Sequence, residues 1–369
     1  MPKAKQTILE LNLNALAHNY NYLRLKLKPT TKFLAVVKAF AYGSDAVKIA
    51  LKLESVGVDY FAVAYTSEGV VLREAGIKLP ILVLHPLADN FDELLRHRLE
   101  PSLYSTKILS EFIALAQKKG QKDYPVHIKF NTGLNRLGFR ENEVDAVLEI
   151  LDRSPEVKMA SIFSHLAASE DLNEKAFTLG QIETFKRIAK TIEDKLSRVV
   201  CKHTLNTSGI INYPEAQFDM VRSGIGLYGF GNDPEVDRQL KPVATLKTAI
   251  SQIHSISPEE SVGYNRGYIS SKERVTATLP LGHADGIGKQ YGNGKAYVTV
   301  NGKKAPIIGN VCMDMIMIDI TGLNCQEGDE VVIFGEDPTA HEMATGVKTI
   351  SYELLTGISQ RVKRLCIDD

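Results

Sequence analysis

The chain has 369 residues and lacks any apolar run close to the roughly twenty residues that a membrane span needs. Its opening segment, MPKAKQTILELNLNAL, also lacks the long apolar core of a signal peptide. Both absences argue against a membrane partner, and we expect a cytoplasmic protein.

Charge of one sign is also lacking. Lys plus Arg and Asp plus Glu each number 44, so the formal net charge is zero. A protein that binds nucleic acid usually carries an excess of basic side chains, and this balance gives no reason to expect such a partner.

Cysteine is scarce and scattered. The four cysteines are Cys201, Cys312, Cys325 and Cys366, and no two of them form a CxxC pair. This spacing argues against zinc ribbons and disulfide frameworks, and it favours reduced thiols in the cytoplasm.

Several motifs of known chemistry are missing as well. The segment GIGKQYGNGKAY does not fit a Walker A loop, and the GxSxG of hydrolases is absent. One GxGxxG occurs at Gly224, Gly226 and Gly229, but no clear helix follows it, so a dinucleotide site is not expected. His283 and Asp285 have no further ligands at metal spacing, so we predict no metal site.

What the sequence does contain, up to about residue 230, is an alternation of strand-like and helix-like segments with short loops. The series begins at TILELNLN and closes at DMVRSGIG, and it holds about eight such pairs. Parallel βα units give this pattern, and their number fits a closed barrel better than an open sheet. We therefore predict an α/β fold with an N-terminal TIM-type (β/α)8 barrel.

After about residue 240, strand signals dominate. Asn301-Gly302 lies between two strand-like runs and predicts a hairpin, and one late helix is expected around TISYELLTGIS. We predict a C-terminal, mostly antiparallel β domain. The barrel is assigned residues 1–238 and the β domain residues 239–369, with residues 1–10 packing on the β domain.

The segment FLAVVKAFAYG, residues 33–43, is the most informative. Its apolar half is typical of a buried strand, which places Lys38 where the strand ends. In a parallel barrel this end carries the chemistry, and a lysine among apolar neighbours loses solvation and becomes nucleophilic. The alternative is a solvated lysine just past a strand.

Other predicted strands also end in polar residues, and a barrel would bring these ends to one mouth. These residues are Lys129, Asn131, Arg136, His165, His203, Asn206 and Arg222. Backbone amides at Gly224 and Ile225, with the Thr207 hydroxyl, could hold a phosphate. A Schiff-base lysine, a phosphate nest and an arginine for a ring nitrogen together describe a pyridoxal phosphate site.

The motifs VVKAFAYG, HIKFNTGLNRLGF, FSHLAAS, HTLNTSG, VRSGIGLYG, SVGYNRGY, GNVCMDM and TISYELLTGISQRV occur in this order along nearly the whole chain. Together they resemble the alanine racemase family, whose members pair a barrel that binds pyridoxal 5'-phosphate with a β domain. The resemblance implies interconversion of L- and D-alanine by two bases, which supplies D-alanine for peptidoglycan.

The same resemblance implies residue roles. Lys38 would bind the cofactor and act as one base, and Tyr264 would be the other, supported by His165 and Arg222. The cofactor-binding residues would be Lys38, Tyr42, Arg136, His203, Asn206, Thr207, Arg222, Gly224, Ile225 and Tyr352. Arg136 and Met313 would contact substrate, Asp314 would lie near its entrance, and Lys129 is a position that is often carbamylated in the family.

In the family, Tyr264 and Met313 belong to the neighbouring subunit's β domain, so a homodimer with shared active sites is implied. Some positions depart from the usual pattern: Phe40, Asn131, Thr207, His283 and Lys289. His283 and Lys289 lie at the entrance, so they put the breadth of substrates in doubt.

Three other functions stay open on the sequence alone. A broader amino-acid racemase or a decarboxylase would share the fold, although Arg222 argues against the decarboxylase. A non-catalytic pyridoxal phosphate-binding protein would share the barrel but lack the β domain. A Schiff-base aldolase would need no residues that hold a phosphate.

Overall fold

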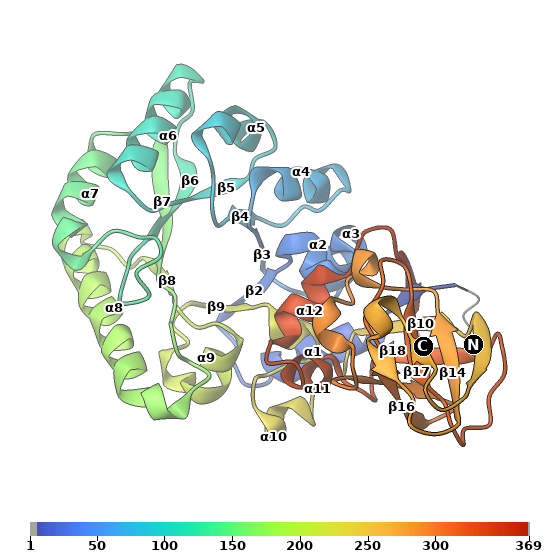
Figure 1. Cartoon of the computed structure of the whole chain (residues 1–369). Helices are drawn as coiled ribbons and strands as arrows, with labels where there is room; N and C mark the ends of the chain where they lie inside the picture. Colours follow the sequence, from blue (N-terminus) through green and yellow to red (C-terminus); the bar gives the residue numbers. More distant parts are fainter. Residues whose placement is uncertain (1–5, 368–369) are drawn as a thin grey trace.

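Eight parallel strands form a nearly closed barrel in the computed structural model, which describes residues 6–367 (Figure 1). The hydrogen-bonded order is β8-β7-β6-β5-β4-β3-β2-β9. The last gap, between β8 and β9, is bridged where Asp219 N–H donates to Lys202 O (3.1 Å) and Arg222 N–H to Leu205 O (3.0 Å). The predicted barrel is therefore confirmed. Its strands are β2 (Lys32–Val36), β3 (Tyr60–Val63), β4 (Ile81–Val83), β5 (Glu100–Leu103), β6 (Tyr124–Lys129), β7 (Val157–Phe163), β8 (Cys201–His203) and β9 (Met220–Ser223).

Helices follow most of these strands and pack their apolar stripes outside the barrel. Asp45 and Ser105 begin two of them, because each side chain accepts a hydrogen bond from the first turn of its helix. The helices of this half are α1 (Leu13–Arg24), α2 (Lys38–Gly43), α3 (Ala46–Val56), α4 (Thr66–Glu74), α5 (Phe91–Arg96), α6 (Thr106–Lys118), α7 (Val144–Asp152), α8 (Lys175–Leu196), α9 (Thr207–Asn212) and α10 (Pro234–Asp237).

A second sheet of nine strands forms the C-terminal half, in the order β11-β14-β17-β16-β15-β18-β10-β1-β19. All of its neighbours are antiparallel except β1 and β19, as predicted for this half. A short pair, β12 (Ser261–Val262) and β13 (Tyr268–Ile269), stands apart. The other strands are β10 (Ala244–Ala249), β11 (Gln252–Ile256), β14 (Arg274–Leu279), β15 (Tyr297–Val300), β16 (Lys303–Ile308), β17 (Ile316–Asp319), β18 (Glu330–Phe334) and β19 (Lys363–Ile367).

The first strand of the chain belongs to this second sheet and not to the barrel. The sequence pattern starts the series of βα pairs at TILELNLN, but β1 (Ile8–Asn12) pairs with β10 and β19. A strand buried on both faces has the same apolar pattern in either sheet, so its partner cannot be read from the strand itself. Residues 1–5 lie outside the described range, and the domain border at 238 and 239 stays a prediction.

Two local expectations for the C-terminal half were partly met. The hairpin is confirmed, because Val300 pairs with Lys303 around Asn301 (φ 49°) and Gly302 (φ 73°). The late helix is present as α12 (Ser351–Gly357), but α11 (Ala340–Thr345) was missed. Its start is a capping box in which Thr339 and Glu342 bond each other's backbone, a signal that the sequence does carry.

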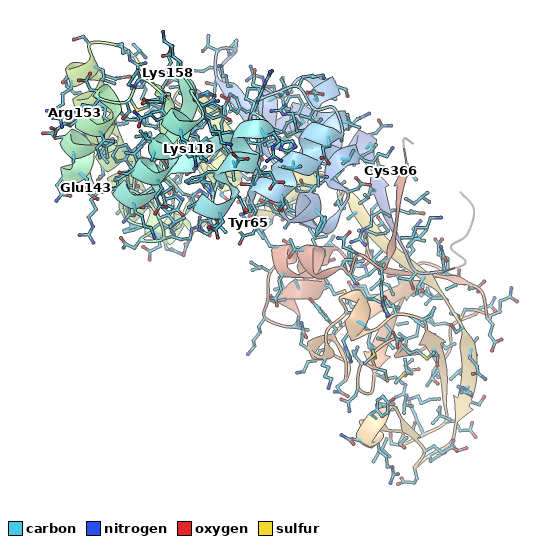
Figure 2. All side chains as sticks on the ribbon, turned by 90° about the horizontal axis from the view of Figure 1, so that it is seen from above. Tyr65, Lys118, Glu143, Arg153, Lys158 and Cys366 are labelled. Atoms are coloured by element: carbon cyan, nitrogen blue, oxygen red, sulfur yellow. The ribbon has the colours of Figure 1, made fainter. Side chains whose placement is uncertain are left out.

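The two halves meet where α2 of the barrel contacts α12 of the C-terminal half. Gly43 ends α2, and a Cβ there would lie 2.0 Å from Leu355 O. Arg364 Nη2 also donates to Gly43 O (2.8 Å). Figure 2, seen from above, shows Tyr65 on the barrel side that faces this seam, whereas Lys118 and Lys158 lie toward the barrel's far end.

Within residues 6–367, none of the helices combines the length and apolar character that crossing a membrane requires.

Candidate active site

The carboxyl ends of the barrel strands surround a cavity of about 590 Å³. Its described lining contains four lysine and arginine side chains, Lys38, Lys129, Arg136 and Arg222, and no carboxylate. Such a pocket favours an anionic ligand. The predicted site residues that line it are Lys38, Tyr42, Lys129, Arg136, His165, Asn206, Thr207, Arg222, Gly224, Ile225 and Tyr352.

Lys38 begins a left-handed turn directly after β2. The four residues Ala39–Tyr42 have φ values of 53°, 54°, 54° and 55°. This conformation costs about 1–2 kcal/mol for each non-glycine residue, so other contacts must hold it. Ala39 N–H donates to Glu68 Oε1 (2.6 Å), and Ala41 N–H donates to Val37 O (3.0 Å). The strained residues directly follow Lys38, which the sequence predicts as the nucleophile.

The amine of Lys38 is poorly solvated. Burial, followed by the nearby Arg136, lowers its pKa from the ordinary lysine value, and Glu68 opposes the shift. A lower pKa leaves more of the unprotonated amine at neutral pH, and the unprotonated form is the nucleophile and the base.

One end of the cavity is built to hold an oxyanion. Gly224 and Ile225 line the wall of the cavity there. A Cβ on Gly224 would lie 2.0 Å from the Tyr42 Oη. Tyr42 stacks on Tyr228 at 4.5 Å between ring centroids, and Tyr352 lies 6.0 Å from Tyr42. Burial raises the pKa of Tyr42 and of Tyr352, so both stay hydroxyl donors.

Thr207 and Asn206 complete this end through α9. Thr207 Oγ1 lies 3.0 Å from Ser223 Oγ and also accepts a hydrogen bond from Gly226 N–H (3.3 Å). Asn206 caps α9 by accepting from Gly209 N–H (2.9 Å), which fixes Thr207 at the first position of the helix. Hydroxyls and backbone amides can therefore meet a phosphate here without an ion pair.

Arg222 forms the floor of the cavity and is held by five acceptors. Its guanidinium donates to His203 Nδ1 (2.8 Å) and O (3.1 Å), Ser164 O (2.7 Å), Thr204 O (3.0 Å) and His165 Nδ1 (3.3 Å). Burial lowers the pKa of Arg222 to about 9. Burial and then Arg222 hold the pKa of His165 well below its usual range, so this imidazole is neutral.

His203 lies behind Arg222 and does not line the cavity. Its ring stacks on Phe163 at 4.9 Å, and Arg222 and Lys129 lie over the same phenyl ring at 5.4 and 5.6 Å. His203, which the sequence predicts to bind the cofactor, therefore contacts the cavity indirectly, by its hydrogen bonds with Arg222.

Lys129 and Arg136 add two further cations to the lining of the cavity. Burial, then Arg136, Arg222 and Lys38, lower the pKa of Lys129 to about 8. Within the described part of the chain, neither side chain has an ion pair with a carboxylate. This corner concentrates positive charge that has no acidic partner.

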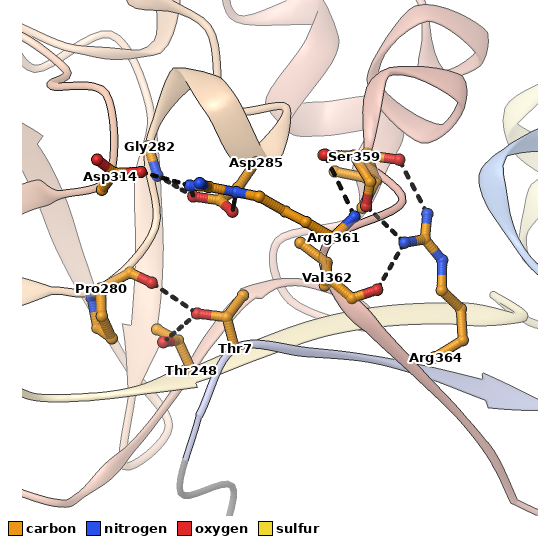
Figure 3. A network of polar contacts seen from close by, with 11 residues as sticks. Thr7, Thr248, Pro280, Gly282, Asp285, Asp314, Ser359, Arg361, Val362 and Arg364 are labelled. Atoms are coloured by element: carbon orange, nitrogen blue, oxygen red, sulfur yellow. Dashed lines mark hydrogen bonds and ion pairs between the residues drawn. The ribbon is translucent and has the colours of Figure 1, made fainter.

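Tyr264, Met313 and Asp314 are not in this cavity. They line a separate hollow of about 450 Å³ on the C-terminal half, where Tyr264 is 72% and Met313 59% exposed. Asp314 accepts from Arg361 Nη2 (2.6 Å), and Arg361 also holds Asp285 by two hydrogen bonds (Figure 3). The single chain therefore does not bring its two predicted bases together.

The ion pair with Arg361 also explains Asp285, which the sequence offers as a possible metal ligand. Among residues 6–367, no group of three or more His, Cys, Asp or Glu side chains is arranged to hold a metal ion.

Some lining residues were missed. His85 and Phe163 face the cavity, and Glu68 holds the Lys38 turn and the backbone of Ala64 and Tyr65. His85 follows β4, so the rule that polar residues end barrel strands would have found it. Glu68 lies in the first turn of α4, and nothing in the sequence distinguishes it from an ordinary helix-start acid.

Comparison with protein families gives two matches that together cover most of the chain. The model described as "Alanine racemase, N-terminal domain" matches residues 11–232, and "Alanine racemase, C-terminal domain" matches residues 243–366.

Curated relatives match over nearly the full length. Alanine racemase 1 of Clostridium acetobutylicum is 37% identical over 370 residues, covering 97% of this chain and 94% of the relative. Alanine racemase of Treponema denticola is 37% identical over 372 residues, covering 97% of both.

Solved structures are similarly close. Alanine racemase of Clostridium difficile 630 has a TM-score of 0.91 and 32% identity, covering 99% of this chain and 96% of that one. The enzyme of Bartonella henselae, with covalently bound pyridoxal phosphate, has a TM-score of 0.89 and 30% identity, covering 98% and 99%. The enzyme of Bacillus anthracis with bound L-Ala-P has a TM-score of 0.91 and 29% identity, covering 100% and 97%.

Proposed function

The chain belongs to the alanine racemase family, and from this premise we propose that it interconverts L- and D-alanine with pyridoxal 5'-phosphate, using Lys38 and Tyr264 as its two bases. It is thus an isomerase, like the relatives that it resembles. The observation that carries the proposal is a cavity lined by Lys38, Arg222, the buried Tyr42 and the partly buried Tyr352, without a carboxylate among the described lining residues.

The residues present fit a phosphorylated pyridine cofactor. The Gly224 backbone approaches Tyr42 closely enough that any side chain at 224 would fill the cradle. Tyr42, Thr207, Tyr352 and the amides near Ile225 would hold the phosphate. Arg222 would meet the ring nitrogen, and Arg136 would meet the phenolic oxygen and the substrate carboxylate.

When bound, pyridoxal 5'-phosphate supplies an electron-withdrawing ring that acidifies the Cα proton of an attached amino acid. Lys38 Nζ removes or returns this proton on one face, and Tyr264 Oη does so on the other. A proton taken on one face and delivered on the other inverts the centre and leaves the overall composition unchanged. Arg222 only donates hydrogen bonds, so it stabilises a ring nitrogen that carries no proton.

We place the two bases on different subunits of a homodimer. The support is that Tyr264 lies outside the Lys38 cavity and is 72% exposed, together with Met313 at 59%. An exposed apolar cluster of this kind marks a contact surface. A twofold dimer would complete two sites by the same contact.

Further parts of the proposal rest on family membership. We assign the barrel domain to residues 1–238, with residues 1–10 packing on the β domain, and the β domain to residues 239–369. We place the enzyme in the cytoplasm and propose that its D-alanine serves peptidoglycan synthesis. For Lys129 both states stay open, a free cation and a carbamate that would pair with Arg136. The lowered pKa of Lys129, about 8, is compatible with the carbamate because only a neutral amine adds carbon dioxide.

Reduction with borohydride tests the central residue. After the purified chain is loaded with pyridoxal 5'-phosphate, reduction should fix the cofactor on the peptide that contains Lys38. Lys38→Ala should lose this label, the visible absorbance of the cofactor and about 10⁴-fold or more in kcat, because it removes both an anchor and a base. A label on any other lysine would refute the assignment.

A broader amino-acid racemase is the second candidate, favoured by His283 and Lys289 at positions where the family usually differs. Turnover of L-alanine compared with L-serine and L-lysine separates the two. Comparable kcat/KM values for all three would favour the broader enzyme. A non-catalytic cofactor carrier is disfavoured because the C-terminal domain matches over residues 243–366.

A further inference from the structure

Below the cavity floor, five side chains from five strands form an unbroken hydrogen-bonded chain through the barrel interior. Arg222 Nη1 lies 2.8 Å from His203 Nδ1, and His203 Nε2 lies 2.8 Å from Ser161 Oγ. Ser161 Oγ lies 2.6 Å from His127 Nδ1, and His127 Nε2 lies 2.6 Å from Glu100 Oε2. We call these five residues the core relay. It runs from β9 through β8, β7 and β6 to β5.

The direction of every hydrogen bond in the core relay is fixed by its two ends. Arg222 can only donate, so His203 Nδ1 accepts and its Nε2 carries the proton. His203 then donates to Ser161, Ser161 to His127 Nδ1, and His127 Nε2–H to the Glu100 carboxylate. Tyr60 Oη donates to the same carboxylate oxygen (2.8 Å). All donors therefore point from the cavity toward Glu100.

The burial of these polar side chains costs free energy of folding, which suggests that they have a function. His127, His203 and Ser161 are 0%, 0% and 1% exposed, in a barrel core that apolar side chains could fill. The five acceptors around Arg222 include no carboxylate. A buried guanidinium is stabilised by negative charge, and the relay connects it to Glu100 by polarised hydrogen bonds.

We propose that Glu100, His127 and Ser161 are positioning residues, which act through His203 to hold the guanidinium of Arg222 in its orientation toward the cavity. Reversal of the relay would place a His203 Nδ1–H donor against an Arg222 N–H donor, and the guanidinium would have to turn. The catalytic consequence rests on the proposed function, in which Arg222 meets the cofactor ring. The tautomers of the relay do not depend on it.

The surroundings agree with a neutral His203. Burial, then Arg222 and His127, hold the pKa of His203 well below its usual range. At the other end, Tyr60, Tyr124 and Arg73 face Glu100, and burial followed by Glu100 raises the pKa of both tyrosines. None of these groups lines the cavity in the described structure, so they affect the site only through the relay.

Histidine nitrogen chemical shifts test the relay without any reaction. The full chain, labelled with ¹⁵N at its nine histidines, should show His203 as a neutral ring protonated at Nε2 between pH 6 and 9, and His127 with a proton on Nε2. His203→Gln and His127→Gln assign the two signals. A His203 ring protonated at Nδ1, or at both nitrogens, would overturn the proposal whether or not the chain is a racemase.

Two serines give a matched pair of variants. Ser161→Ala removes the middle of the relay, whereas Ser102→Ala removes a hydroxyl of equal size on β5 that is 0% exposed and has no hydrogen-bond partner. Ser102 pairs in register with His127, so both changes lie in the same layer of the core. Ser161→Ala should lower kcat about tenfold with KM changed less than about twofold, because one net hydrogen bond is lost behind Arg222.

Glu100→Gln tests the far end with little change in shape. Its amide oxygen still accepts from His127, but the negative charge is gone, so kcat should fall about threefold. Both relay variants should shift the pH at which the visible absorbance of the loaded enzyme titrates, and Ser102→Ala should not. Equal effects of all three variants would refute the relay. If neither relay variant folds, the wild-type tautomers decide, and a wild-type chain that binds no cofactor would refute the proposed function alone.

Discussion

The barrel and the C-terminal half differ in how firmly they hold the side chains that we assign to the site. Arg222 on the barrel is 4% exposed and held by five acceptors, while Tyr264 on the C-terminal half is 72% exposed. The barrel therefore fixes its binding groups by its own packing. The C-terminal half presents Tyr264 on its surface, and in the proposed homodimer the partner subunit would complete the site around it.

This difference divides the chemistry as well. In the proposed function a single chain would bind the cofactor, because the oxyanion end and Arg222 share one cavity. It has only one of the two proposed bases at that cavity, because Tyr264 lines a separate hollow. Binding and inversion should therefore respond differently to changes in the two halves.

Tyr264→Phe should show the largest difference between the effect on catalysis and the effect on cofactor binding. Loss of the phenol removes one proton-transferring group, so kcat should fall about 10³-fold, within the range for general acid–base groups. Cofactor absorbance should be unchanged, because Tyr264 is absent from the described lining of the cofactor cavity. Steady-state racemisation and the visible spectrum of the loaded enzyme measure both effects.

Mixing Tyr264→Phe with Lys38→Ala then tests whether the bases come from different subunits. After subunit exchange, half of the dimers carry one variant of each kind, and each of these has one intact site. Activity should recover to about a quarter of that of the wild type. Each variant alone is the control, and a mixture that stays inactive after proven exchange would contradict the shared site.

The contrast also shows where the sequence was informative. Strand ends in a parallel barrel converge, so the sequence alone is enough to group Lys38, Lys129, His165 and Arg222. β1 was counted in the barrel series, although residues 1–10 were also expected to pack on the β domain, because its apolar pattern fits either sheet. Glu100, His127 and Ser161 were missed because they lie within strands and not after them, and a polar residue inside a strand is more often one that faces solvent.

The strained turn after Lys38 was also beyond the sequence. Four consecutive residues with positive φ carry no glycine, and the alanines and aromatics of Ala39–Tyr42 have no preference for that conformation. The conformation is imposed by contacts from α4 and α12, which are distant in sequence. Gly43 is the one residue of the segment whose type indicates a close approach.

Gly43→Ala should test the seam that joins the two halves. The new Cβ would meet Leu355 O at 2.0 Å, and φ at this residue is 79°. Overpacking against backbone together with a left-handed residue should cost about 3 kcal/mol or more. The midpoint of urea unfolding measures the loss, and the displaced Lys38 turn should lower cofactor affinity as well.

Gly76→Ala is the control for that change. Gly76 also has a positive φ, 95°, but nothing lies within 4 Å of its added Cβ. Only the cost of a non-glycine residue at positive φ remains, so the free energy of unfolding should fall by about 1 kcal/mol. Equal losses at the two glycines would mean that the seam contact contributes nothing to stability.

Lys129→Met should change the stability with the opposite sign. Burial and three neighbouring cations lower the pKa of Lys129 to about 8, whereas the unfolded chain keeps an ordinary value near 10.4. Between these values the unfolded state binds more protons, so the unfolding free energy rises with pH from about 8 to 10. At pH 7 the buried cation destabilises the fold, and methionine should relieve about 3 kcal/mol.

The gain should therefore be largest at pH 7 and shrink toward pH 10, when measured by urea unfolding in buffer free of carbon dioxide. Lys118→Met, at an exposed position on α6 toward the far end of the barrel (Figure 2), should show neither the gain nor the pH dependence. Added bicarbonate should stabilise the wild type but not Lys129→Met, because a carbamate would replace the cation by an anion beside Arg136 and Arg222. A gain that is independent of pH would show that the charge of Lys129 is not what destabilises this corner of the cavity.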